Sequence, residues 1–127
     1  MVDMDMAGFY AARLAEDEAT AKAALAGPWH IDRDPLQGLR IMDGRGLVVT
    51  WTPGFYERGD SDATHIALND PARVLREVEA GRAILAMYAD GLAYDDYAVG
   101  RVIRVLVAVY SDHPDYDEEW AKDRRGI

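Results

Sequence analysis

The sequence contains no cysteine, which excludes disulfide bonds, thiolate metal ligands and cysteine nucleophiles. A chain without cysteine suits a reducing compartment, so we expect a cytoplasmic protein. The first five residues include two aspartates and no basic residue, whereas a secretory signal starts with a basic region before an apolar core. We therefore expect no secretion.

Long apolar runs and excess positive charge are also lacking. The longest strongly apolar stretch, residues 102–110, is interrupted by Arg104 and is far shorter than the roughly 20 residues that span a bilayer. The 14 Lys and Arg face 23 Asp and Glu, which gives a formal net charge of -9 and a surface that repels phosphates. We expect no membrane span and no direct binding of nucleic acid. Mimicry of nucleic acid toward a basic partner stays open as an alternative.

The 127 residues have the length of a single domain, and we expect one domain over residues 1–127. Alanine and other strong helix formers over residues 4–26 predict an N-terminal helix, which Gly27 and Pro28 terminate. The three consecutive acids at positions 16–18 are expected on its solvated outer face, with an acidic docking patch as the alternative.

A small antiparallel sheet is predicted over residues 29–51. Apolar segments flank the turn-forming residues 43–46, a pattern typical of a β-hairpin, and a short strand beginning near Trp29 adds a third member. We interpret Trp29 and Trp51 as packing residues, with a ligand cage as the alternative. Residues 52–62 are polar and rich in glycine, and we predict a loop over residues 52–69.

A second helix is predicted over residues 71–89. Asp70 can accept hydrogen bonds from the free amides of a first turn, and Pro71 suits the first helical position because it lacks an N–H. Arg73 and Glu77 lie one turn apart on its outer side and are expected to pair in solvent.

A third helix is predicted over residues 94–109, although its many β-branched residues also suit a strand. The short connection before it favours an antiparallel pair of helices, and residues 111–127 form a tail. The predicted fold is therefore α+β, with an N-terminal helix, a hairpin or three-stranded antiparallel sheet, and a C-terminal antiparallel helical hairpin.

Three unusual segments resemble a family of small uncharacterised proteins from actinobacteria and their phages. They are Gly27-Pro28-Trp29, residues 65–80, and Asp112-His113-Pro114-Asp115-Tyr116 together with Trp120. The resemblance implies an actinobacterial or phage origin, and it brings no established activity or catalytic residue.

Two histidines beside acids offer the sharpest chemical hypothesis. His65 with Asp70, and His113 with Asp115, are suitable ligands for a transition metal, and antiparallel helices would bring the two groups together. A metal-binding protein or small hydrolase is therefore one alternative. No nucleophile elbow, phosphate loop or dinucleotide motif accompanies them, so we assign no catalytic residue and no cofactor.

A role in binding another protein needs fewer specific residues than a metal site or a catalytic site does. Exposed aromatics can anchor a partner, and the acidic charge can steer a basic one. The candidate partner-binding residues are Phe55, Tyr56, Tyr116 and Trp120, with packing in a small core as their alternative role. We favour an accessory or regulatory protein that binds an unknown protein partner, and a homodimer is a further alternative.

Overall fold

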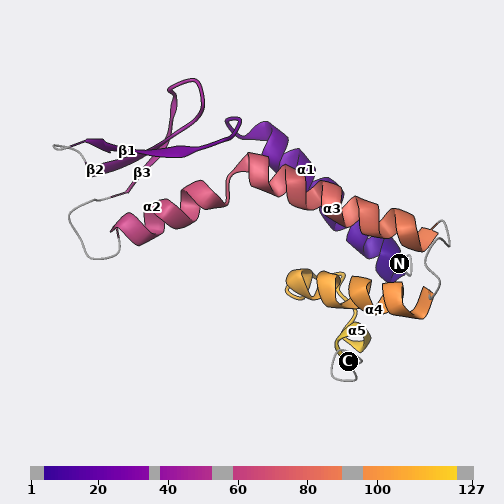
Figure 1. Ribbon diagram of the computed structural model, residues 1–127. Helices are drawn as coiled ribbons and strands as arrows, with labels where there is room; N and C mark the ends of the chain where they lie inside the picture. Colours follow the sequence, from indigo (N-terminus) through magenta and orange to yellow (C-terminus); the bar gives the residue numbers. More distant parts are fainter. Residues whose placement is uncertain (1–4, 35–37, 53–58, 90–95, 123–127) are drawn as a thin grey trace. The chain divides into compact units, whose positions relative to one another are not determined.

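A computed structural model describes residues 5–34, 38–52, 59–89 and 96–122 of the chain (Figure 1). It contains an N-terminal helix, a three-stranded antiparallel sheet and then further helices, which confirms the predicted α+β class. The elements are α1 (Met6–Ala23), β1 (His30–Asp34), β2 (Gly38–Met42), β3 (Val48–Thr52), α2 (Gly59–Leu68), α3 (Pro71–Ala89), α4 (Asp96–Val107), the 3-10 helix η1 (Ala108–Tyr110) and α5 (Glu119–Lys122).

Contacts within the chain define two compact units. One comprises residues 17–77, and the other comprises residues 1–16 and 78–127. Helices α1 and α3 each contribute residues to both units. The single domain predicted over residues 1–127 stays a prediction.

Helix α1 begins where the sequence offers an N-cap. The Asp5 carboxylate accepts a hydrogen bond from the amide of Gly8 at 2.7 Å, and the Asp5 carbonyl accepts one from the amide of Phe9 at 2.9 Å. The helix then continues to Ala23, within the predicted range of 4–26.

The sheet has the order β1-β2-β3, and both neighbouring pairs are antiparallel. Asp43 organises the turn between β2 and β3, because its Oδ1 atom accepts hydrogen bonds from the amides of Arg45 at 2.9 Å and Leu47 at 2.8 Å. Gly46 in the same turn has a φ of 89°, a conformation that glycine adopts without steric cost. The predicted hairpin and its third strand are thus confirmed.

The predicted loop over residues 52–69 is wrong for the part that forms α2. Ala63 is fully buried against Leu39 and Ile41 of β2, and Ile66, one turn further along, packs on the same cluster. Asp60 and Asp62 stabilise the first turn of α2 through the helix dipole. The polar composition that indicated a loop therefore belongs to the exposed face of a helix that covers the sheet.

Helix α3 begins as predicted. The Oδ1 atom of Asp70 accepts a hydrogen bond from the amide of Arg73 at 2.9 Å, and the Asp70 carbonyl accepts one from the amide of Val74 at 3.1 Å. Pro71 is the first residue of the helix, and Ala89 is the last. The predicted pair of Arg73 and Glu77 forms at 3.0 Å.

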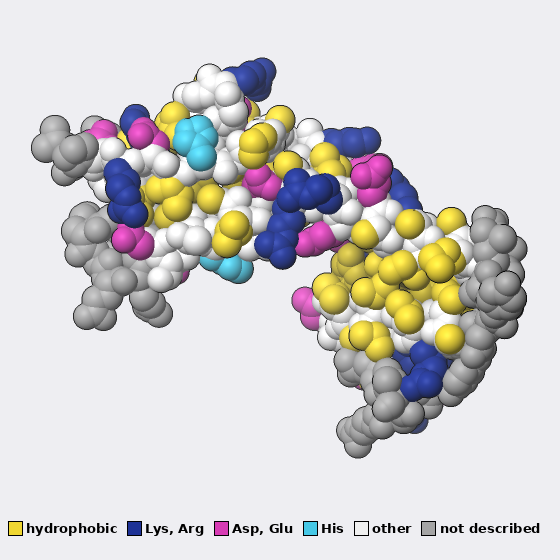
Figure 2. Space-filling model, viewed as in Figure 1, with side chains coloured by type: hydrophobic (Ala, Val, Ile, Leu, Met, Phe, Trp, Pro, Cys, Tyr) yellow, Lys and Arg dark blue, Asp and Glu magenta, His cyan; other side chains and the backbone are white. Residues whose placement is uncertain are grey.

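Residues 96–107 form a helix, so the strand alternative for this segment is wrong. Ile103 and Val107 are fully buried, whereas Val102, Val105 and Val109 are exposed, and hydrophobic side chains gather over α4 in Figure 2. The tail contains the short helix α5. None of the helices in the described ranges has the length and apolar character needed to cross a membrane.

Candidate functional site

Asp70 holds together two of the segments that carry the family resemblance. Besides capping α3, its carboxylate accepts a hydrogen bond from the amide of Trp29 at 2.8 Å through Oδ2. The residue is only 6% exposed, and each of its carboxylate oxygens is bonded to a backbone amide. One side chain therefore fixes both the start of a helix and the segment Gly27-Pro28-Trp29.

Glycine at position 27 allows this close approach. A Cβ atom placed there would lie 2.8 Å from Oδ2 of Asp70 and 2.8 Å from Cβ of Ala72, both inside the normal contact distance. The Gly27–Pro28 peptide bond is cis. After it, the indole N–H of Trp29 donates a hydrogen bond to the carbonyl of Leu25 at 2.8 Å, which orients the ring.

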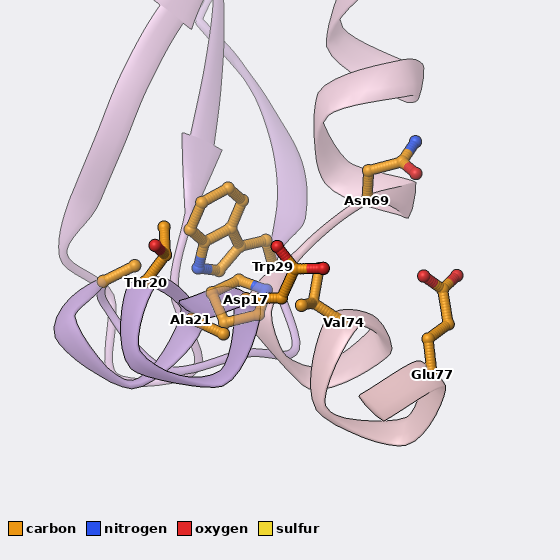
Figure 3. A pocket seen from close by; sticks show the side chains of 9 residues that line it. Asp17, Thr20, Ala21, Trp29, Asn69, Val74 and Glu77 are labelled. Atoms are coloured by element: carbon orange, nitrogen blue, oxygen red, sulfur yellow. The ribbon is translucent and has the colours of Figure 1, made fainter. Parts of the chain in front are cut away.

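The oriented indole lines a cavity of about 350 Å³ within the unit of residues 17–77 (Figure 3). Its walls come from the end of α1 and the first two turns of α3. We call it the Trp29 pocket, and it is lined by Asp17, Thr20, Ala21, Ala24, Trp29, Asn69, Pro71, Val74 and Glu77. Its size is within the range of small-molecule and side-chain binding sites.

The Trp29 pocket has a negative charge. Asp17 lies on the α1 wall and Glu77 on the α3 wall, and none of the nine lining residues is cationic. Two ion pairs involve acids of these helix segments: Arg73 with Glu77 at 3.0 Å and Lys22 with Glu18 at 3.7 Å. The pocket therefore joins an apolar, aromatic interior to carboxylates on two of its walls.

The predicted ligands His65 and Asp70 belong to this same unit. His65 is an exposed residue of α2, where it lines a shallow hollow with Asp60, Ser61, Thr64 and Leu68. Asp70 uses its carboxylate oxygens for the backbone amides described above. In the part of the chain that the structure describes, no three His, Asp or Glu residues are grouped so that they could hold a metal ion. The predicted metal site stays a prediction without support from the geometry.

The other two predicted ligands, His113 and Asp115, belong to the unit of residues 1–16 and 78–127. Nη1 of Arg13 lies 2.9 Å from Nδ1 of His113, and the amide of Asp115 lies 3.0 Å from the same nitrogen. Because a guanidinium and an amide N–H can only donate, Nδ1 accepts both hydrogen bonds. Arg13 is 6% exposed and also pairs with Glu16 at 2.9 Å.

Phe9 contacts this pair and links it to further aromatic rings. Phe9 is fully buried, and its ring centroid lies 5.6 Å from His113, 6.0 Å from Tyr116 and 5.1 Å from Trp120. The Arg13 guanidinium lies over the Phe9 ring at 4.9 Å, a cation–π arrangement. We call this group the aromatic cluster; its rings are Phe9, Tyr110, His113, Tyr116 and Trp120.

The predicted partner-binding residues fall in two places. Tyr116 is only 8% exposed and Trp120 packs on it, which fits the packing role that the sequence left open for these aromatics. Phe55 and Tyr56 lie outside the described residues. Whether any of the four contacts a partner stays a prediction.

All three segments of the family resemblance thus take part in specific contacts, two at the Trp29 pocket and one in the aromatic cluster. A family model matches residues 3–122, a range that includes both places. The chain belongs to DUF6221, a family of unknown function. No curated protein and no solved structure matches this DUF6221 chain.

Sequence reasoning did not bring the acids of the Trp29 pocket together in this DUF6221 chain. Asp17 and Glu77 were both predicted to be solvated residues on the outer faces of their helices, with an acidic docking patch as the alternative for residues 16–18. Trp29 was interpreted as packing, with a ligand cage as the alternative. Trp29 does pack against the buried cluster of the sheet, and it also lines the pocket. The signal available in the sequence was the pair of unusual segments, Gly27-Pro28-Trp29 and Asp70-Pro71, that the fold brings together.

Proposed function

We propose that the protein is a small acidic accessory or regulatory protein that acts by binding another protein, with the Trp29 pocket as its contact site. The resemblance to proteins of actinobacteria and their phages supports a partner in the cytoplasm of such a host. The observation that carries the proposal is an open cavity of about 350 Å³ that combines an indole with two carboxylates. Tryptophan is enriched among the residues that dominate protein interfaces.

The composition of the pocket favours binding over catalysis. Its nine lining residues include no histidine, lysine, arginine or serine, and the described geometry pairs no hydroxyl with a base among them. Thr20 has the only hydroxyl among them. The alternative of a metal-binding protein or hydrolase that uses His65 and His113 stays a prediction, as does mimicry of nucleic acid.

Site-specific photo-crosslinking tests the proposal. A photoreactive amino acid at Thr20, which lines the pocket, is compared with the same amino acid at Ala19, which is also exposed on α1 but does not line it. We expect a partner protein to crosslink from position 20 in actinobacterial cells and not from position 19.

A pocket-filling variant makes the experiment specific. Ala24→Trp fills the cavity from an exposed lining position, and Ala19→Trp adds the same bulk outside it. The crosslink from position 20 should be lost with the first substitution and retained with the second. Crosslinking that is equal from both positions, or unaffected by Ala24→Trp, would contradict the proposed function.

A further inference from the structure

The charge and shape of the Trp29 pocket point to one class of occupant. We infer that the pocket receives a basic side chain, lysine or arginine, from the partner protein; this inference rests on the proposed function. A basic side chain has an aliphatic stem and a cationic end, and the pocket offers a complementary surface to each.

The carboxylates complement the cationic end. Asp17 on α1 and Glu77 on α3 place negative charge on two walls, while the lining residues contribute no positive charge. Glu77 already pairs with Arg73, but both side chains are largely exposed, at 62% and 48%. Ion pairs between exposed side chains are weak, so an incoming cation can share or replace this partner.

The helix ends also favour a cation. The last turn of α1, with Thr20 and Ala21, forms part of the wall, and the carboxyl end of a helix carries a partial negative charge. The opposite, positive end of α3 is capped by the Asp70 carboxylate. The electrostatic character of the walls is therefore negative.

The apolar surface complements the aliphatic stem. Ala21, Ala24, Pro71 and Val74 present hydrocarbon, against which the methylene groups of lysine or arginine can pack. The indole of Trp29 attracts a cation placed over its face, and arginine also stacks on such a ring. A neutral side chain of the same length would lose both electrostatic interactions.

A pair of peptides tests this inference directly. The probe is a nine-residue acetylated and amidated peptide of glycine and serine with one central arginine, and its match carries citrulline, which is neutral but nearly the same shape. Binding to the full chain is followed by NMR through the indole N–H signals of the three tryptophans. We expect the arginine peptide to shift the Trp29 signal and to bind at least about threefold more tightly than the citrulline peptide.

Charge-removing variants then locate the effect. Asp17→Asn and Glu77→Gln should each weaken binding of the arginine peptide by about threefold and leave the citrulline peptide unaffected. Glu18→Gln is the matched control, since it removes an acid next to Asp17 that does not line the pocket. Raising the salt concentration should weaken only the arginine peptide.

The inference would be overturned if the two peptides bound equally well. It would also be overturned if Asp17→Asn and Glu77→Gln both left the affinity for the arginine peptide unchanged. These outcomes are separate from those of the crosslinking experiment. A partner that crosslinks from Thr20 and is displaced by Ala24→Trp, together with equal binding of the two peptides, would leave the proposed function standing and refute the basic occupant.

Discussion

Each of the two units of this protein contains a buried charged side chain. In one unit that side chain lies near an open pocket, and in the other it belongs to a packed core. In the unit of residues 17–77 the buried carboxylate of Asp70 is bonded to backbone amides, and an open pocket lies beside the Trp29 segment that it holds. In the other unit the buried guanidinium of Arg13 faces His113 and lies over the Phe9 ring of the aromatic cluster. The buried cluster of the first unit is a small aliphatic group, whereas the second unit contains a group of contacting aromatic rings.

The difference separates residues that support the fold from residues that are available for binding. In the aromatic cluster, Tyr116 and Trp120 contact each other and Phe9, so most of their surface serves packing. At the Trp29 pocket, the buried side chain of Asp70 holds the Trp29 segment in place, and the carboxylates of Asp17 and Glu77 line the cavity. The Trp29 pocket is therefore the place that suits a binding partner. Substitutions should affect the two units differently.

The largest expected effect is in the aromatic cluster. Phe9→Ala removes a fully buried ring that contacts His113, Tyr116 and Trp120, and it should lower the free energy of unfolding by about 3–5 kcal/mol. Urea unfolding measures the change. Val109→Ala is the control in the same unit, because Val109 is 75% exposed and should change the stability by less than about 0.5 kcal/mol. Similar losses for the two variants would show that Phe9 does not anchor this core.

An intermediate effect is expected at Gly27. The added methyl of Gly27→Ala would overlap Asp70 and Ala72, so it should destabilise the protein by about 1–3 kcal/mol and weaken binding of the arginine peptide. Gly44→Ala is the matched control: no atom lies within 4 Å of the added methyl, and its effect should stay below about 0.5 kcal/mol. Equal stability of the two variants would contradict the close packing at Asp70.

A smaller, pH-dependent effect is expected at the hairpin turn. The hydrogen bond from the amide of Leu47, aided by the amide and side chain of Arg45, holds the pKa of Asp43 below its usual value of 3.8. The charged carboxylate therefore contributes stability above pH 3.8, and this contribution is lost as the pH falls through the lowered pKa. At pH 6 the wild-type protein should unfold at a higher urea concentration than Asp43→Asn. The difference between the two unfolding midpoints should become smaller toward pH 3. A gap that does not change with pH would contradict this account.

No effect is expected from the removal of metal ions. If His65, Asp70, His113 and Asp115 held a metal ion, chelation would destabilise the protein. We expect EDTA to leave the Tm of protein purified without a histidine tag unchanged. A fall in Tm that zinc or manganese reverses would revive the metal alternative.

Local signals in the sequence predicted much of the fold. Asp70 and Pro71 set the start of α3, and residues 43–46 set the turn, because capping and turn formation depend on neighbouring residues. Helix α2 was missed because its buried face depends on the sheet: Ala63 and Ile66 pack on β2, and few other apolar residues in it reveal a helical period.

The Trp29 pocket was beyond prediction for a related reason. Asp17, Trp29 and Glu77 are far apart in the sequence, and each has an ordinary local interpretation as an outer-face or packing residue. Their proximity depends on tertiary contacts, of which the hydrogen bond from the Trp29 amide to Asp70 is one. The sequence contained the two segments that meet there, but not the fact that they meet.

Helices α1 and α3 pass from one unit into the other, and this continuity ties the melting of one unit to that of the other. If the packing of either unit were lost, the remaining pieces of α1 would be shorter than the roughly 12–15 residues at which an isolated helix becomes even marginally stable in water. The part of α1 that belongs to the unpacked unit would then lose its helical structure. A calorimetric scan should show one cooperative endotherm instead of two steps.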